Sequence, residues 1–103
     1  MNQQIFSEIQ SLKQRILPNE KVILFGSQAR GDAREDSDWD LLVLLNKDKR
    51  NFNDDYDKYA FPFDELGWKY NILINAIIYT KKDWETYPSL LKYNIEREGI
   101  EIV

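Results

Sequence analysis

The sequence contains no cysteine and no histidine. The lack of cysteine excludes disulfides and thiolate metal sites, and the lack of histidine removes the commonest zinc ligand and the usual general base. Glycine and proline are also scarce, at four and three residues of 103, which argues against a fibrous or low-complexity chain. Any acid–base or metal chemistry in this protein therefore depends on carboxylates.

Two further absences concern partners. No apolar run approaches the ~20 residues that span a bilayer, and the N-terminal MNQQIFSEIQ lacks a basic segment followed by an apolar core. The formal charge is −4 and no window is strongly basic, so the electrostatic footprint of a protein that binds long nucleic acid is missing. These features predict a cytoplasmic protein with no membrane association.

What is present predicts one folded α/β domain over residues 1–103, because 43% of the residues are hydrophobic and the length suits a single core. Apolar residues at helical spacing predict an amphipathic helix from Ile5 to Leu17. Short apolar runs predict strands at 21–25, 38–45 and 71–80, and "IEIV" after Gly99 predicts an edge strand.

The connecting segments are less regular. Residues 81–87 and 90–98 predict short helices, the second ended by Gly99. Residues 46–70 are polar with interspersed aromatics, and Pro62 argues against one uninterrupted helix. We therefore expect a loop there, followed by a short helix or an irregular segment.

The stretch between the first two strands carries the candidate chemistry. Gly26 ends a strand and precedes SQAR, which suits a short helix, so the amides of Ser27 and Gln28 can point at an anion. Glycine lets that anion approach the main chain, and the Ser27 hydroxyl adds a donor. Arg30, one helical turn later, either contacts the same phosphate or forms a surface ion pair with Asp32 or Glu35.

Asp38 and Asp40 form the second half of this site. On a strand their spacing sends both carboxylates to one face and Trp39 to the other. Two neighbouring carboxylates with no histidine or cysteine nearby suit a hard cation, Mg²⁺ or Mn²⁺. A phosphate cradle beside such a pair is typical of a nucleoside-triphosphate site.

Similar motifs fit less well. A P-loop requires Lys and Ser or Thr where Asp32 and Ala33 stand, and an EF-hand requires Gly and Glu where Leu41 and Lys47 stand. The structural alternative is that Ser37 to Asp40 form a capping box that opens a leucine-rich helix. In that case the chain is an α/β domain without a nucleotide site.

The string GSQARGDAREDSDWDLLV resembles the signature of the polymerase-beta-like nucleotidyltransferase superfamily, in its branch of minimal nucleotidyltransferases. The resemblance implies a mixed sheet flanked by helices, with Asp38 and Asp40 on a central strand as ligands of two metal ions. It also implies that Gly26 and Ser27 hold the triphosphate, and it includes Ser37 in the nucleotide-binding motif.

One position departs from the family pattern. The third family carboxylate lies on the next strand, where Asn75 stands in this sequence. Asparagine offers a carbonyl oxygen to a metal, but it has no charge and cannot accept a proton. Asp64 or Glu65 could replace the missing carboxylate if the alignment were shifted.

By resemblance, the chain transfers AMP from ATP to a hydroxyl group with Mg²⁺, and a tyrosine of a helical HEPN-type toxin is a plausible acceptor, which would make the chain an antitoxin. A polymerase is disfavoured because no sequence remains to grip primer and template, and an antibiotic-modifying transferase of this length requires a homo-oligomer. The rival hypothesis is a catalytically weakened or silent module of the same fold, and it is supported by Asn75.

Overall fold

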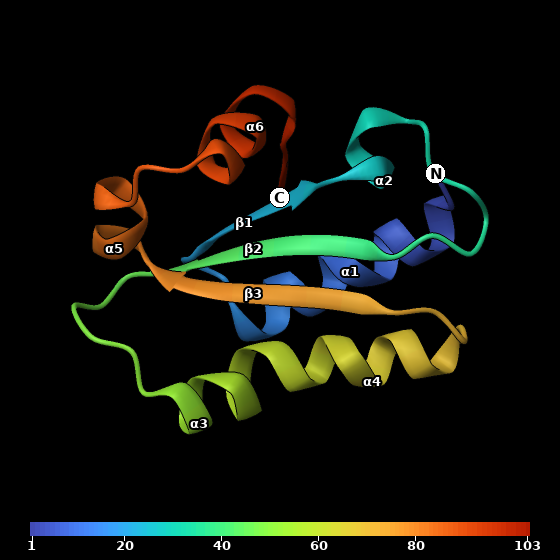
Figure 1. Ribbon diagram of the computed structural model, residues 1–103. Helices are drawn as coiled ribbons and strands as arrows, with labels where there is room; N and C mark the ends of the chain where they lie inside the picture. Colours follow the sequence, from blue (N-terminus) through green and yellow to red (C-terminus); the bar gives the residue numbers. More distant parts are fainter.

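The computed structural model describes all residues from Met1 to Val103 and shows a four-stranded mixed sheet with helices on both faces (Figure 1). The strands are β1 (Lys21–Phe25), β2 (Trp39–Leu45), β3 (Ile74–Thr80) and β4 (Ile100–Ile102). The helices are α1 (Gln3–Ile16), α2 (Ser27–Arg30), α3 (Phe52–Asp55), the π-helical η1 (Tyr56–Ala60), α4 (Phe61–Lys69), α5 (Lys81–Thr86) and α6 (Leu90–Glu98). The predicted α/β class with a mixed sheet is confirmed.

The strand order is β3-β2-β1-β4, so β2 lies inside the sheet and β4 at one edge, as the sequence predicted. Strand β1 runs antiparallel to both β2 and β4, whereas β2 and β3 are parallel. The register places Phe25 opposite Asp40, and Asp40 opposite Asn75. These three residues therefore form one row across the sheet.

The strands bury both faces of the sheet. Trp39, Leu41 and Val43 of β2 belong to the main core with residues of α1, whereas Leu42 and Leu44 pack in a second core with Trp84 of α5 and Ile95 of α6. Because both faces are covered, the sequence of β2 is a nearly continuous apolar run, without the alternation of apolar and polar residues seen in half-exposed strands. The alternative of a capped leucine-rich helix at this position is wrong.

The segment between β2 and β3 differs from the expected loop. Helical structure continues from Phe52 to Lys69 through α3, η1 and α4, and Pro62 lies in the first turn of α4. The wider π turn ends just before Pro62, so Pro62 lies where a new helical turn begins. Proline has no backbone N–H, and at this position the loss of that hydrogen-bond donor costs little stability. No single uninterrupted α-helix forms, as predicted, but the loop covers only residues 46–51 and the helical part after it is longer than expected.

A buried carboxylate holds the start of this helical segment. Asp55 is fully buried and forms an ion pair with Lys47 and another with Arg50, and it also accepts a hydrogen bond from the Asn51 backbone N–H at 2.9 Å. Arg50 in turn donates to the Ile78 carbonyl oxygen of β3 at 2.6 Å. The network ties the loop after β2 to the edge strand.

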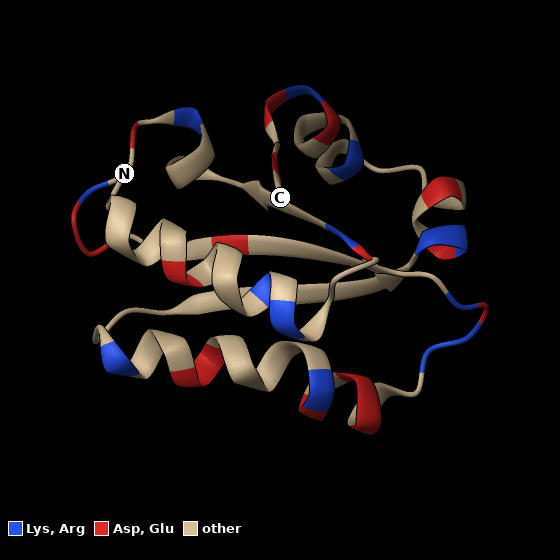
Figure 2. Ribbon diagram, turned by 180° about the vertical axis from the view of Figure 1, so that it is seen from behind, with Lys and Arg blue, Asp and Glu red and all other residues tan.

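Other boundaries shift by a few residues. Strand β3 begins at Ile74 rather than at Asn71, which has a positive φ of 54° in the preceding turn. Charged residues lie mostly on the helices and loops, and few lie in the middle of the sheet (Figure 2). None of the helices combines the length and apolar character needed to cross a membrane.

Candidate functional site

The two candidate metal ligands lie at the start of β2. Trp39 is the first residue of this strand and is only 1% exposed, on the face of the sheet covered by α1 and α4. Asp40 follows it and therefore points to the opposite face, where it is half-buried. Asp38 is exposed and lies one residue before the strand rather than within it.

Gly26 comes into direct contact with Asp40. It adopts φ 77° and ψ −158°, a conformation that L-residues rarely adopt, and it connects β1 to α2. A Cβ atom at this position would lie 2.6 Å from Asp40 Oδ2, closer than van der Waals contact allows. Only glycine therefore lets the main chain pass the Asp40 carboxylate at this distance.

Helix α2 begins immediately after this turn, at Ser27. The Arg30 N–H donates to the Gly26 carbonyl oxygen at 3.1 Å and closes the first helical turn. The amides of the preceding residues have no acceptor within the helix, as at every helix start. The turn thus places the free backbone N–H groups at the start of α2, beginning with Ser27, directly after Gly26 and close to Asp40.

The loop between α2 and β2 is folded by its own side chains. The Ser37 hydroxyl accepts a hydrogen bond from the Arg34 N–H at 2.8 Å, and the buried Gln28 amide donates to the Ser37 carbonyl oxygen at 3.2 Å. Ser37 is therefore occupied in shaping the loop that leads to Asp38. The side-chain role of Gln28 was not predicted, because a glutamine within a short polar segment gives no sign of burial.

Arg30 forms ion pairs in this structure. Its Nε lies 3.3 Å from Asp32 Oδ2, and its Nη1 lies 3.6 Å from Glu98 Oε2 on α6. The hydrogen bond and charge of Asp32, together with the charge of Glu98, raise the pKa of Arg30 above its ordinary value. Of the two readings of Arg30, the surface pair with Asp32 is present, and phosphate contact stays a prediction.

Asn75 lies beside Asp40, as the register requires. Its Nδ2 donates to Asp40 Oδ1 at 3.3 Å. No group of three or more acidic, histidine or cysteine side chains suited to a metal ion occurs in the structure. Asn75, which the resemblance places at the position of the third family carboxylate, thus lies beside Asp40 and donates to it.

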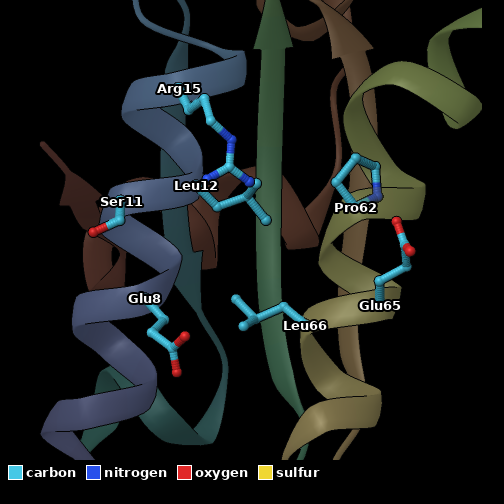
Figure 3. Close-up of a pocket in the computed structure, with 7 residues that line it drawn as sticks. All are labelled: Glu8, Ser11, Leu12, Arg15, Pro62, Glu65 and Leu66. Atoms are coloured by element: carbon cyan, nitrogen blue, oxygen red, sulfur yellow. The ribbon is translucent and has the colours of Figure 1, made fainter.

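Neither substitute carboxylate reaches this site. Asp64 accepts a hydrogen bond from the Tyr56 hydroxyl on the surface of the long helical segment. Glu65 lines a groove of about 340 Å³ between α1 and α4 (Figure 3). These two helices cover the face of the sheet that carries Trp39, opposite to the face of Asp40. The alternative in which Asp64 or Glu65 completes the carboxylate set is wrong.

A cleft of about 430 Å³ opens beside Gly26. Phe25, Gly26 and Arg30 form one side, and α6 forms the other with Leu91, Asn94, Ile95, Arg97 and Glu98. This contribution of α6 was not predicted. The helical pattern of residues 90–98 predicts a helix but does not indicate which face of the sheet it covers.

The chemistry of these donors suits a hard divalent cation. Asp38 and Asp40 offer carboxylate oxygens, Asn75 can offer an amide oxygen after rotation of its side chain, and no sulfur or nitrogen ligand is near. The glycine turn and the start of α2 offer N–H donors to an anion. The arrangement can therefore bind a metal-bound phosphate ester.

Comparisons with known proteins identify a family model and two similar sequences. The family model described as "Nucleotidyltransferase domain" matches residues 4–102. Two inferred protein adenylyltransferases of Methanocaldococcus jannaschii are similar in sequence. One is 36% identical over 88 residues, which cover 81% of this chain and 78% of the relative. The other is 33% identical over 81 residues, which cover 79% and 71%.

Solved structures show the same fold. A chain of a toxin–antitoxin crystal structure with AMP-PNP superimposes with a TM-score of 0.68 at 17% identity, covering 100% of this chain and 73% of the other. A chain of a mutant of the toxin–antitoxin MntA–HpeT gives 0.65 at 14% identity, with 95% and 71% covered. An inferred nucleotidyltransferase of Sulfolobus solfataricus gives 0.53 at 16% identity, with 95% and 78% covered.

Proposed function

The chain belongs to the nucleotidyltransferase domain family, and from this premise we propose that it transfers AMP from ATP to a hydroxyl group of a protein. The observation that carries the proposal is the contact of Gly26 with Asp40, because it joins a phosphate-binding turn to a carboxylate ligand. The similarity to inferred protein adenylyltransferases supports AMP as the transferred group and a protein as the acceptor.

In the proposed reaction each residue has a separate task. Asp38 and Asp40 hold Mg²⁺ or Mn²⁺, which neutralises phosphate charge when bound. Ser27 and the first amides of α2 hold the triphosphate, and Arg30 exchanges its surface partner Asp32 for a phosphate oxygen.

The chemical step is a displacement at the α-phosphorus. The acceptor oxygen forms a bond to this phosphorus, the bond from it to the bridging oxygen of the β-phosphate breaks, and pyrophosphate leaves. The hydroxyl proton needs an acceptor, which Asn75 cannot be because its amide is neutral and already donates to Asp40. The proton therefore passes to Asp38, Asp40 or water.

The acceptor that we propose is a tyrosine of a HEPN-type toxin partner, with this chain as the antitoxin. Two of the structurally similar chains come from toxin–antitoxin complexes, one of them with AMP-PNP. Those likenesses concern the fold, so the assignment to a toxin partner rests on the resemblance of the motif as well.

The test uses ATP labelled in the α- or the γ-phosphate, with Mg²⁺ and a glutamate–tyrosine copolymer as acceptor. We expect the α-label to enter the copolymer and the γ-label to leave as pyrophosphate, and Asp40→Asn to abolish the transfer. Label from γ-phosphate in the copolymer would indicate a kinase and contradict the proposal. If neither label is transferred although ATP still binds, the chain is a catalytically silent binding module and the proposed transfer is contradicted.

That silent module is the second candidate function, and the hydrogen bond between Asn75 and Asp40 favours it. With an amide in place of the third carboxylate, the site has less negative charge to hold a second metal ion. In this case the chain binds the nucleotide and a protein partner but transfers slowly or not at all.

A further inference from the structure

The inference concerns where the nucleotide base binds, and it rests on the proposed function. The cleft between the Gly26 turn and α6 begins next to the contact of Gly26 with Asp40. Its volume of about 430 Å³ falls within the range of small-molecule sites. A nucleotide whose phosphates lie at Ser27 can therefore extend into this cleft without leaving the same face of the sheet.

The interior of the cleft is apolar on two sides. Phe25 of β1 lies on one side, and Leu91 and Ile95 of α6 lie on the other. Phe25 is half-buried, and both Phe25 and Ile95 belong to the core between the sheet and α6. These side chains give the slot an apolar surface against which an aromatic ligand can pack.

One uncharged polar side chain faces this slot. Asn94 lies on α6 between Leu91 and Ile95, is half-buried, and makes no side-chain hydrogen bond within the chain. Its amide therefore has a free donor and a free acceptor beside the apolar walls. Small-molecule sites commonly combine apolar walls with a few such groups that fix the orientation of the ligand.

The charged side chains gather around one carboxylate of the cleft. Arg97 Nη2 lies 2.9 Å from Glu98 Oε1, and Arg30 Nη1 lies 3.6 Å from Glu98 Oε2, so Glu98 bridges two guanidinium groups. Arg30 also belongs to the helix that begins at Ser27. Arg30 thus places a positive charge on the α2 side of the cleft, next to the proposed phosphate site at Ser27, whereas Asn94 lies on the α6 side.

We propose that this cleft binds the adenine base of the nucleotide and that Asn94 reads its edge. Adenine presents an acceptor at N7 beside a donor at N6, and an asparagine amide can pair with both. Guanine presents two acceptors at the same edge, N7 and O6, so the amide can satisfy only one of them. The site therefore prefers adenine to guanine.

The experiment compares binding of AMP-PNP, GMP-PNP and inorganic triphosphate by calorimetry, all with Mg²⁺. We expect the wild-type protein to bind AMP-PNP more tightly than the other two. Asn94→Leu is expected to lower AMP-PNP affinity at least about 5-fold, the loss of one bidentate pair, and to leave triphosphate affinity unchanged. Asn53→Leu, an exposed asparagine on α3, is the matched control and should change neither affinity.

The outcomes separate this inference from the proposed function. Equal affinity of the wild-type protein for AMP-PNP and triphosphate would overturn the base site and leave the phosphate site standing. An Asn94→Leu variant with unchanged AMP-PNP affinity, or one that loses both ligands equally, would also overturn it. A wild-type protein that binds none of the three ligands would contradict the proposed function itself, and the base site with it.

Discussion

The two residues next to the Asp40 carboxylate, Gly26 and Asn75, are better explained by a ligand site than by a contribution to the stability of the fold. Gly26 has a positive φ, and a Cβ atom there would meet Asp40 Oδ2 at 2.6 Å, while Asn75 donates to Asp40 Oδ1 at 3.3 Å. Neither residue belongs to the hydrophobic cores, so their arrangement is not required for packing.

The first prediction concerns Gly26→Ala. The new methyl group would meet Asp40 Oδ2 at 2.6 Å, so the carboxylate has to move, and the positive φ adds a strain of roughly 1–2 kcal/mol. We expect loss of Mg²⁺-dependent AMP-PNP binding in calorimetry, together with a lower free energy of unfolding in urea.

Gly31→Ala is the matched control for this change. Gly31 also has a positive φ, of 82°, but a Cβ atom there would meet nothing within 4 Å. Gly31→Ala therefore strains the same loop without a steric contact, although by less than Gly26→Ala, because Gly31 has ψ 11° in the left-handed region and Gly26 has ψ −158°. Nucleotide binding should be kept. Equal loss of binding in both variants would show that strain in the loop, and not the contact with Asp40, explains the effect of Gly26→Ala.

The second prediction concerns Asn75→Asp. The change restores a carboxylate opposite Asp40 and adds a charged ligand for a metal ion. We expect AMP-PNP affinity to change little and the rate of pyrophosphate release with the tyrosine copolymer to rise. An unchanged rate would argue against Asn75 as a metal-ligand position, although it would leave the fold assignment intact.

At the scale of elements, the segment α3–η1–α4 depends on the buried Asp55. Burial alone raises the pKa of Asp55, but hydrogen bonds from Lys47, the Asn51 backbone and Arg50 outweigh burial, so the pKa is lowered. The ionised carboxylate thus stabilises the folded state above the pKa of the unfolded chain, ~3.9. This contribution disappears as the pH falls through the lower pKa of the folded state.

The third prediction follows for Asp55→Asn. The variant leaves Arg50, whose side chain is 14% exposed, and Lys47 without their anionic partner, so we expect it to lose about 3 kcal/mol of unfolding free energy at pH 7. Urea unfolding at pH 7 and again below pH 4 measures the difference, which should shrink at the lower pH. A difference that does not depend on pH would contradict the assigned role of the charge.

Asp54→Asn provides the control for that prediction. Asp54 is the preceding residue and forms an exposed pair with Lys58 four positions later, with side-chain exposures of 49% and 60%. Exposed pairs contribute about 0–1 kcal/mol, so the variant should be nearly as stable as the wild-type protein.

The elements that were predicted correctly are those whose signal is local. Helix α1 has a regular apolar stripe with Asn2 as its cap, and β1 and β2 are short apolar runs bounded by turn residues. The helical segment at 52–69 is longer than the short helix that the sequence predicts after a loop. The π turn that accommodates Pro62, and the ion pairs of Asp55 that anchor the segment, depend on tertiary contacts that a local pattern does not contain.

In the whole molecule, the candidate site also combines residues from one local motif with residues that only tertiary packing brings together. Gly26, Ser27, Asp38 and Asp40 were predictable because they lie within fifteen consecutive residues whose spacing carries the chemistry. The wall formed by α6 was not predictable, since it joins Gly26 to residues near 94 in the sequence through the packing of α6 on the sheet. The motif could therefore be found in the sequence, and the shape of the cleft could not.

The central claim is that the glycine turn and the two aspartates form a site for a metal-bound triphosphate. Calorimetric titration of ATP with and without Mg²⁺, beside the double variant Asp38→Asn, Asp40→Asn, tests it most directly. We predict binding that requires Mg²⁺ and that the double variant loses while it stays folded. No binding of ATP at millimolar concentration, or binding that the double variant retains, would contradict the account.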